Sequence, residues 1–497
     1  MFRVKSSFLL LTQLFCAIGW LTGCAVGPDY QRPALVVPEN YQAAADVQLS
    51  HWQPTQAALP DLRYAWQAFN DATLTQLLAE LDTANQDIQA AAARYRQADA
   101  VLQRSRAQLF PTVGASAGIE RGNSSARTGA DENDSAIRNR RDVTLNASWE
   151  ADLWGRVRRD NEAARANLHA SAADLAAVRL SAQATLAVTY FQLRVTDAHK
   201  QLLDRTVAAY EKSLAIATNR YRAGVVSRAD VAQAETQWQS AQTQARDATL
   251  QRAQFAHAIA VLLGKPPALF ALPEAPEFIA MAYARADSAG LAESALPQVP
   301  VAVPSTLLQR RPDIALAEQR VIEANAQIGA ARAAWFPVLT LGASGGYQSN
   351  SAADWLTLPN RVWAVGPALA GVLFDGGARA GTERAAVARY DETVADYQQV
   401  TLTGFREVED NLLALQLLRD EAVTQDAAVR AARVSVELLT NQYQAGKVGY
   451  LDVVNVQTIA YTNARTALVI LANRYSATIN LIRALGGGWD TQQLAQE

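Results

Sequence analysis

Two long stretches of the chain contain neither glycine nor proline and are rich in helix-forming residues. Residues 156–223 consist largely of Ala, Arg, Gln, Leu and Glu, which lose little free energy in a helix. A continuous helix of that length would extend ~100 Å. Gly224 ends this run, and residues 225–263 form a second one. The pattern predicts two long helices joined by a tight turn.

The second half of the chain has the same pattern. Residues 378–445 and 450–485 predict two further long helices, with Gly404 inside the first and Gly446 after it. The apolar positions of all four runs are mostly Ala, with scattered Leu and Val, which gives weak heptad seams. Small residues on more than one face suit a helix that touches neighbours on two sides, as in a helical barrel.

Between the helices lie segments in which apolar and polar residues alternate. Residues 142–152 alternate strictly over about the length of a membrane β-strand. Residues 112–121 predict its partner strand, and residues 338–347 and 361–373 repeat the pair. Pro367 removes one ladder hydrogen bond, which an edge strand or a bulge tolerates. The aromatics expected at membrane interfaces are Trp149, Trp154, Trp355 and Trp363.

Matching residues show that the chain is a tandem duplication. Arg94, Phe110 and Pro111 recur as Arg320, Phe336 and Pro337, at an offset of 226 (320 − 94). The segment Tyr221-x-Ala223-Gly224 recurs as Tyr443-x-Ala445-Gly446, at an offset of 222 (443 − 221). Each half therefore predicts a helix, two strands and two long helices.

The number of strands predicts an oligomer if the strands span a membrane. Known membrane barrels have about eight or more strands, so the four of one chain cannot close. An open sheet edge in lipid would leave backbone groups without hydrogen bonds. The alternative interpretation is an ordinary soluble hairpin packed on a helix bundle.

The N-terminus predicts a secreted lipoprotein. Arg3 and Lys5 precede an apolar stretch over residues 8–20, which is shorter than the ~20 residues of a spanning helix. Leu21-Thr22-Gly23-Cys24 follows and resembles a bacterial lipobox, in which the cysteine carries lipid. Ala25 then implies sorting to the outer membrane, since retained lipoproteins of that class carry Asp there. A plain signal peptide with a chance cysteine is the alternative.

Composition argues against enzymes and nucleic-acid binding. Without residues 1–23 the chain has 43 basic and 48 acidic residues, so it lacks the basic surface of a nucleic-acid-binding protein. The four histidines, His51, His169, His199 and His257, lie far apart, which favours surface or packing roles over a metal site. The sequence contains no phosphate-binding loop, nucleophile elbow or CxxC motif. We therefore expect no catalytic site and no cofactor besides covalent lipid on Cys24.

Several segments resemble the TolC-type outer-membrane factor family. They are Cys24-Ala25-Val26-Gly27-Pro28-Asp29-Tyr30, Arg310-Arg311-Pro312-Asp313-Ile314, Leu373-Phe374-Asp375-Gly376-Gly377, Phe405-Arg406-Glu407-Val408-Glu409-Asp410 and Leu485-Gly486-Gly487-Gly488-Trp489. The resemblance implies a mixed α and β membrane protein, a homotrimer with a 12-stranded outer-membrane β-barrel continued by a periplasmic helical barrel. It implies a passive exit duct coupled through a periplasmic adaptor to an inner-membrane pump, of the resistance–nodulation–division type for a lipoprotein.

The two helix turns are the expected meeting point with the adaptor. The residues are Tyr221, Gly224, Asp230, Tyr443, Gly446 and Asp452. Glycine lets the backbone reverse, and an aspartate favours the first turn of the returning helix, so pure turn chemistry is the alternative. Glu437, with Arg433 four residues earlier, is the expected entrance gate. A plain surface ion pair is equally compatible, and Thr440 is neutral where some relatives carry an acid.

These features divide the chain into a signal peptide (1–23), a lipid-anchored extended segment (24–70), two repeats (71–290 and 291–489) and a tail (490–497). The function expected is an outer-membrane channel of a tripartite efflux pump for small toxic molecules. A duct for type I protein secretion or metal efflux is an alternative within the same class. A structural periplasmic coiled-coil lipoprotein is the alternative of a different class.

Overall fold

The computed structural model describes residues 25–42, 66–123, 137–275, 296–297, 299 and 304–492. The predicted signal peptide, Cys24 and the last five residues of the predicted tail lie outside them. The chain divides into two compact units. The first comprises Met1–Ala34, Arg94–Ser171 and Leu316–Gln398, and the second comprises Leu35–Ala93, Ala172–Ala315 and Gln399–Glu497.

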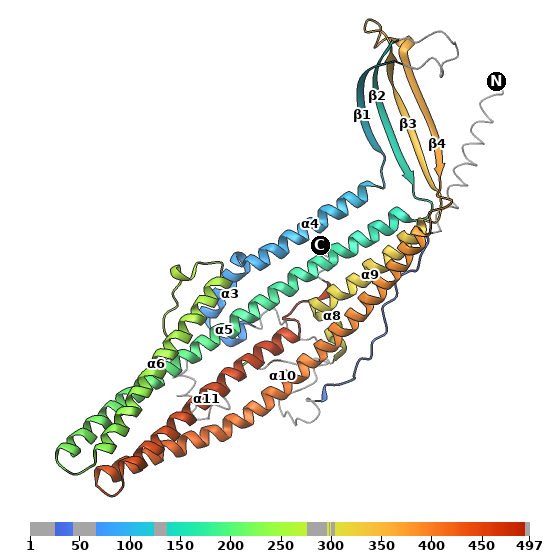
Figure 1. The fold of residues 1–497 in the computed structure, drawn as a ribbon. Coiled ribbons are helices and arrows are strands. Elements are labelled where there is room, and N and C mark those ends of the chain that lie inside the picture. The colour runs from blue at the N-terminus through green and yellow to red at the C-terminus, as the bar shows by residue number, and fades with distance from the viewer. Residues whose placement is uncertain are drawn as a thin grey trace. The chain divides into compact units, whose positions relative to one another are not determined.

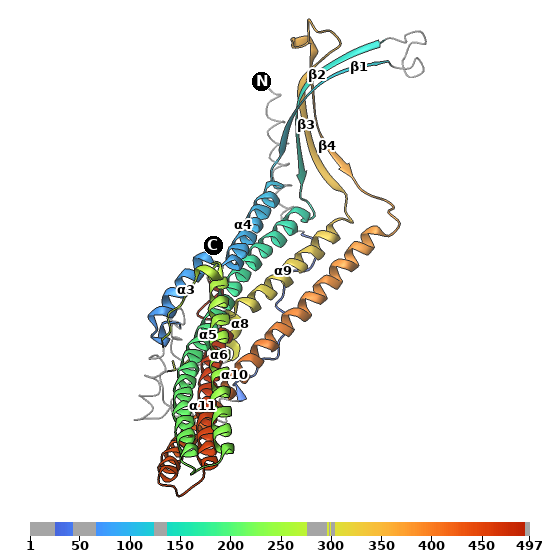
Figure 2. The ribbon, with the colours of Figure 1, turned by 60° about the vertical axis from the view of Figure 1, so that its left-hand side comes forward.

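The first unit contains a four-stranded sheet. Its strands β1 (Thr112–Asn123), β2 (Ile137–Ala151), β3 (Val338–Ser349) and β4 (Arg361–Ala370) lie in sequence order. Every neighbouring pair is antiparallel, so β1 and β4 are the two edge strands (Figures 1 and 2). Pro367 therefore lies on an edge strand, one of the two positions predicted to tolerate proline.

Helices account for most of the remaining described residues. The helices are α3 (Ala72–Ala84), α4 (Gln86–Ala107), α5 (Arg156–Arg222), α6 (Arg228–Leu262), α8 (Leu307–Arg310), α9 (Pro312–Ala333), α10 (Ala378–Gln444) and α11 (Tyr450–Ala484). Short 3₁₀ turns η2 (Gln67–Phe69), η3 (Pro267–Leu269), η5 (Pro304–Thr306) and η6 (Leu358–Asn360) connect them. No helix in the described part of the chain combines the length and apolar character needed to cross a membrane.

The duplication is visible in the bounds of the elements. The first and last residues of α9 lie 226 positions after the first and last residues of α4 (312 − 86 and 333 − 107). The same offset relates β3 to β1. The first and last residues of α10 lie 222 positions after the first and last residues of α5 (378 − 156 and 444 − 222). The same offset relates α11 to α6. The two offsets are those found in the sequence, so the repeat extends to where each element begins and ends.

The strand ends differ from the prediction. β2 begins at Ile137 rather than 142, because its polar first residues pair with the end of β1 up to Asn123. β4 ends at Ala370 rather than 373. The partner of Ala370 is Val338, the first residue of β3, and Pro337 before it has no N–H group to continue the ladder.

The ends of the long helices also shift slightly. The helix predicted from residue 225 begins at Arg228, because the Ser227 side chain caps its N-terminus. The other three long helices begin at the expected residue. All four end one residue earlier than predicted, at Arg222, Leu262, Gln444 and Ala484. Helix ends fray and their last turn is often tightened, so differences of one residue are usual.

The core of the second unit is built around stacked aromatic rings. Phe191 of α5 stacks on Tyr475 of α11, with ring centroids 4.1 Å apart, and Phe69 packs 5.1 Å from Phe191. The buried Tyr190 hydroxyl donates a 2.7 Å hydrogen bond to Asp71, which also caps α3 by accepting from the Leu74 amide. The segment before α3 is thereby fixed to the long helices.

A buried arginine joins three elements of the same unit. Arg311 is 6% exposed and donates to Asp313, to Glu407 of α10 at 2.8 Å and to the Ala484 carbonyl at the end of α11. Burial disfavours the charged guanidinium, but the hydrogen bonds and charges of Asp313 and Glu407 outweigh it and raise the pKa of Arg311. Because Gly404 has no side chain, α10 packs directly against this guanidinium.

Candidate functional site

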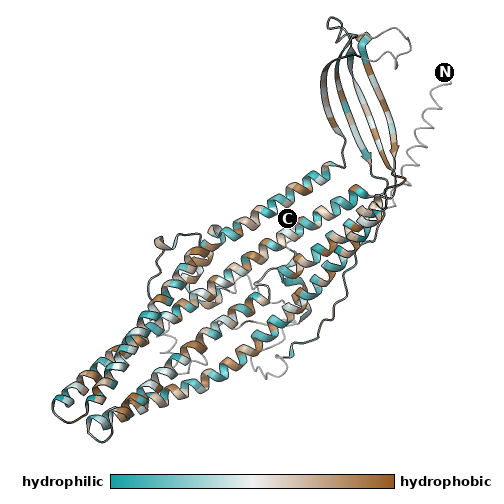
Figure 3. Cartoon of the chain, viewed as in Figure 1, coloured by the Kyte–Doolittle hydropathy of each residue, from teal (hydrophilic) through white to brown (hydrophobic). Residues whose placement is uncertain are grey.

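The register of the sheet places all odd-numbered strand residues on one face. Leu145 of β2 is opposite Ala115 of β1 and Gly345 of β3, and Gly345 is opposite Trp363 of β4. Paired residues share a face, so the alternation in each strand coincides across all four. Along the strands, polar and apolar colours alternate over short distances (Figure 3). We call these two surfaces the odd face and the even face.

The odd face is apolar over most of its length. It carries Val113, Ala115, Ala117, Ile119, Val143, Leu145, Ala147, Trp149, Leu339, Leu341, Ala343, Gly345, Tyr347, Trp363, Val365, Pro367 and Leu369. Several of these side chains are largely exposed: Ile119 and Val365 are each 73% exposed and Leu145 is 60% exposed. An apolar area this large on a protein surface is typical of a membrane or protein contact.

The even face is more polar, and its side chains bond to one another. The hydroxyl groups of Ser116 and Thr144 lie 2.8 Å apart, and the Asn146 amide donates to both of them. Arg140 lies 3.8 Å from Asp142 on the same face. On β4 this face carries only small or aliphatic residues. The sheet thus separates an apolar surface from a largely hydrophilic one.

The four predicted interface tryptophans lie at the two ends of the sheet. At the end joined to the helices, the Trp149 indole donates to the Leu109 carbonyl, and the Trp154 indole donates to Pro337 and stacks on Phe336. At the other end, Trp363 is 71% exposed on β4, and half-buried Trp355 lies in the connection from β3. Their contact with membrane interfaces stays a prediction.

The segment that follows the predicted lipidation site Cys24 lies against the first unit. The Val26 amide donates to the Trp154 carbonyl, and Gly155 leaves space for Ala25. Further on, Arg32 forms two hydrogen bonds, of 2.7 and 2.6 Å, with Glu318 of α9. The residue directly after Cys24 is therefore close to the connection between β2 and α5. Cys24 itself lies outside the described residues, and its lipidation stays a prediction.

The two predicted turns have the same backbone geometry. Gly224 and Gly446 have φ angles of +74° and +75°, a region that favours glycine. Asp230 accepts a 2.9 Å hydrogen bond from the Ser227 amide, and Asp452 accepts a 3.1 Å bond from the Gly449 amide. The geometry of the turns thus explains why glycine occurs at 224 and 446 and aspartate at 230 and 452. Contact of these turns with an adaptor stays a prediction.

The side chains around the two turns differ, although the sequence repeats. Tyr221 is 45% exposed, whereas its counterpart Tyr443 is 5% exposed and packs 5.6 Å from the ring of Tyr450. Burial, followed by the nearby Tyr443, raises the pKa of Tyr450 to about 12. Arg220, one residue before Tyr221, lies 4.6 Å above the Tyr443 ring and donates to the Tyr443 carbonyl. Nothing in the sequence indicated the role of Arg220, because a contact across 223 residues leaves no local signal.

The two predicted gate residues lie on the surface of α10. Arg433 and Glu437 are both exposed, one helical turn apart. Although both are described, the structure has no ion pair within 4.0 Å between them, so the surface ion pair considered above is not formed. In water the entropy lost by two long side chains offsets the attraction between such charges. Thr440 is half-buried, and the gate assignment stays a prediction.

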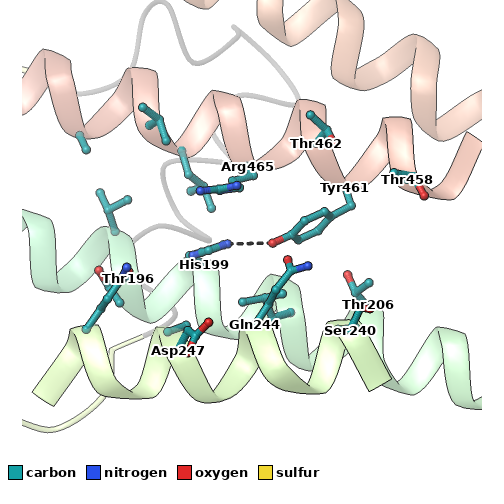
Figure 4. A pocket seen from close by; sticks show the side chains of 18 of the residues that line it. Thr196, His199, Thr206, Ser240, Gln244, Asp247, Thr458, Tyr461, Thr462 and Arg465 are labelled. Atoms are coloured by element: carbon teal, nitrogen blue, oxygen red, sulfur yellow. Dashed lines mark hydrogen bonds between the residues drawn. The ribbon is translucent and has the colours of Figure 1, made fainter. Parts of the chain in front are cut away.

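The second unit also contains a cavity that the sequence did not indicate. It has a volume of about 600 Å³ and lies among α5, α6 and α11. Figure 4 shows His199 and Tyr461 pointing toward each other, with a 3.1 Å hydrogen bond between them. Burial lowers the pKa of His199, and the positive charge of the nearby Arg465 lowers it further. Among the described residues no group of three or more His, Cys, Asp or Glu could hold a metal ion.

Known proteins resemble this chain over nearly its whole length. The outer-membrane protein TtgF of a toluene efflux pump, from Pseudomonas putida, is 30% identical over 478 residues, which cover 95% of each chain. The cation efflux system protein CusC of Escherichia coli is 28% identical, over 96% of this chain and 98% of CusC. The structure of the outer-membrane channel OprN superposes with a TM-score of 0.83 at 27% identity, over 94% of this chain and 100% of OprN.

A sequence profile of the family described as outer membrane efflux protein matches residues 77–265 and 303–487. One matched segment lies in each half of the duplication. Together they cover well over half of the chain. The chain therefore belongs to the outer membrane efflux protein family.

Proposed function

We propose that the chain forms, as a homotrimer, the outer-membrane duct of a tripartite efflux pump. The observation that carries the proposal is the sheet, with an exposed apolar odd face and two edge strands without partners in the described part of the chain. Three copies would supply 12 strands, a number within the range of closed membrane barrels. Pairing β4 of one copy with β1 of the next would hydrogen-bond both edges, which lipid requires.

In that trimer the odd face is the outer, lipid-facing surface and the even face lines the pore. The assignment follows from composition, since apolar side chains are stable in lipid while the paired hydroxyl, amide and charged groups need water. The long helices α5, α6, α10 and α11 of three copies would supply 12 staves of a periplasmic helical barrel. The alanine-rich faces of these helices suit close packing with neighbours on both sides.

The proposed duct is passive, which means that it catalyses no reaction and supplies no energy for transport. Energy comes from an inner-membrane pump of the resistance–nodulation–division type, and a periplasmic adaptor contacts the two turns. The relatives' names support an efflux role over protein secretion, since TtgF is named for toluene and CusC for cations. The proposed cargo is accordingly small toxic compounds. Covalent lipid on Cys24 is an auxiliary anchor, because a closed barrel holds the membrane unaided.

The closed entrance is proposed to lie near the turns, with Glu437 and Arg433 exposed on the pore side of α10. The contact of Arg220 with Tyr443 holds the two turns of one chain together. Widening the entrance would then require the helix pair α10–α11 to separate from α5–α6 at this end.

Conductance in a planar bilayer tests the duct. Purified full-length protein is expected to give low conductance, and variants with Arg433→Gln and Glu437→Gln are expected to conduct differently at the same voltage. Chemical cross-linking would establish the trimer independently. A stable trimer that gives no conductance, in wild type and in these variants, would refute the duct and favour a structural periplasmic lipoprotein. If the protein does conduct, co-purification with a periplasmic adaptor would identify the pump to which it belongs.

A further inference from the structure

A hollow on the odd face is not explained by the proposed duct. It has a volume of about 590 Å³, and most of its lining is odd-numbered: Val143 and Leu145 of β2, Gly345 and Tyr347 of β3, and Arg361 and Trp363 of β4, with Gly346 and Val362 completing it. Its size lies in the range of ~300–1,000 Å³ typical of small-ligand sites. The missing side chain of Gly345 leaves space between Leu145 and Trp363, since no other atom lies within 4 Å of where its Cβ would be.

Three arginines lie on the same face, toward the end of the sheet away from the helices. Arg361 lines the hollow itself. Arg141 lies one odd position beyond Val143, and Arg121 lies one odd position beyond Ile119, the partner of Arg141. Neighbouring odd positions along a strand are ~6.6 Å apart and neighbouring strands are ~4.8 Å apart. The register therefore places the backbone of Arg141 ~12 Å from that of Arg361, within the span of one ligand with two phosphates, and the backbone of Arg121 ~20 Å from it.

These positive charges have no acidic partner on their own face. Among the odd-numbered residues of the four described strands there is no Asp or Glu. The Arg141 side chain donates to the Asn350 carbonyl, which leaves its charge uncompensated. Arg140 differs, because it points to the even face, where Asp142 lies 3.8 Å away. The excess of positive charge is thus confined to the apolar, lipid-facing surface.

We propose that the hollow and the adjoining arginines form a binding site for a phosphorylated lipid of the outer leaflet. An acyl chain lies over Gly345, between Leu145 and Trp363, and the phosphate groups bind Arg361 and Arg141, with Arg121 beyond them. Arginine suits this role because its planar fork matches two phosphate oxygens and is weakly hydrated.

The leaflet follows from chain connectivity, and the site rests on the proposed function, in which the sheet spans the outer membrane. The ends of the strands that join the helices are Thr112, Ala151, Val338 and Ala370. The arginines lie near the opposite ends, so they meet the headgroups of the leaflet farther from the periplasm. A protein partner is less well suited, because the apolar hollow opens on the surface that lipid covers.

The test measures lipid retention by the purified full-length trimer in detergent, by native mass spectrometry. The probes are a diglucosamine lipid with two phosphates, the same lipid without phosphates, and inorganic phosphate alone. We expect saturable binding of the phosphorylated lipid only. Arg141→Gln and Arg361→Gln together are expected to weaken binding about 25-fold, at about fivefold for each arginine, the equivalent of ~1 kcal/mol per charge near an anionic surface.

Matched controls separate the site from the general charge and stability of the sheet. Arg140→Gln removes the neighbouring arginine on the even face and is expected to leave binding unchanged. Gly345→Val fills the hollow and is expected to weaken binding at least tenfold, whereas Gly114→Val adds the same side chain on the even face, where space is also free, without effect.

The outcomes distinguish this site from the duct itself. Equal binding by wild type and by the double arginine variant, or equal binding of the lipid without phosphates, would overturn the inference. Displacement of the phosphorylated lipid by millimolar inorganic phosphate would also overturn it, by reducing the site to an anion site. Planar-bilayer conductance of the same preparations keeps the two proposals apart, because a wild-type trimer that conducts but binds no phosphorylated lipid contradicts only the lipid site.

Discussion

The guanidinium of Arg220 lies 4.6 Å above the ring of Tyr443 and donates a 3.1 Å hydrogen bond to its backbone carbonyl. The contact joins the end of α5 to the end of α10, the two helices that the duplication relates. The same carbonyl, near the C-terminus of α10, also accepts a 2.9 Å hydrogen bond from the Gly446 amide, so Arg220 is its second donor. The cation–π contact cannot form in the reverse direction, because the uncharged Gln442 occupies the position that corresponds to Arg220.

Replacing Arg220 with alanine is expected to favour the open entrance. A cation–π contact and one hydrogen bond together contribute ~1–2 kcal/mol, so the ratio of open to closed channels should rise about 5- to 30-fold. Single-channel recording in a planar bilayer measures this ratio. Arg222→Ala is the control, since Arg222 is exposed at the same turn. Equal open probability in both variants would show that the Arg220 contact does not hold the entrance closed.

Loss of Arg311 is expected to destabilise the second unit. Arg311→Met leaves the Ala484 carbonyl without its buried donor and leaves Glu407 with only Arg483, 3.5 Å away. Leaving a buried polar group without its hydrogen-bond partner costs ~1–3 kcal/mol. Chemical denaturation followed by circular dichroism measures the loss. Arg310→Met, at the half-buried neighbouring position, serves as the control and should change the free energy of unfolding by less than ~1 kcal/mol. Similar losses in both variants would contradict the role of the ion pair.

His199 is expected to make the protein less stable in mild acid. Burial and Arg465 lower its pKa in the folded protein, so the unfolded chain binds a proton at a higher pH than the folded chain. The stability from neutral His199 is present above the unfolded pKa of ~6.5 and decreases as the pH falls below it. Thermal unfolding at several pH values measures this slope.

The change that checks this assignment is His199→Gln, which retains a polar group beside Tyr461 but does not titrate. It should reduce the fall in melting temperature between neutral pH and about pH 5. His257→Gln, at an exposed position of α6, should retain the wild-type slope. An unchanged slope in the His199 variant would assign the pH dependence to other groups.

The faces of the sheet predict opposite effects at two consecutive residues. Leu145→Arg places a charge on the odd face, and near the middle of a bilayer such a change costs ~2–4 kcal/mol. Asn146→Arg places the same side chain on the even face, where water would surround it. Assembly into vesicles, followed by resistance of the folded trimer to protease, should fall for the first variant only. A loss of assembly in both would contradict the assignment of the two faces.

The proposed lipid anchor is expected to be dispensable for conduction. Cys24→Ser protein, directed to the periplasm by a cleavable signal, should assemble in vesicles and conduct as the wild type does. Hydrophobic contact over a whole barrel circumference far exceeds that of acyl chains, at ~0.8 kcal/mol per buried CH₂. Planar-bilayer conductance and mass spectrometry of the N-terminus test the two parts. Assembly that requires Cys24 would contradict the auxiliary role.

Periodicity predicted most of the fold because it records which faces are buried. The offsets of 226 and 222 residues, read from matching residues, recur in the bounds of α4 and α9 and of α5 and α10. Strand ends were less predictable, because β2 continues through polar residues beyond its apolar segment. Such residues pair through their backbone, which is nearly independent of side chain.

The site was predictable only as far as local chemistry determined it. Glycine and aspartate marked both turns, since each acts within a few residues of itself. Tyr221 and Tyr443 looked equivalent in sequence, and only packing makes the first exposed and the second buried. The hollow over Gly345 likewise depends on the register of three strands, which no single strand encodes.

The unequal environments of Tyr221 and Tyr443 have a consequence for stoichiometry. In the proposed trimer, six turns would form a ring in which two chemical kinds alternate. A partner that recognises the exposed ring of Tyr221 would find three equivalent sites, whereas one that recognises only the glycine-capped backbone would find six. Gene duplication thus leaves this ring with threefold symmetry in its side chains and near-sixfold symmetry in its backbone, and the number of adaptor copies bound would report which of the two the adaptor recognises.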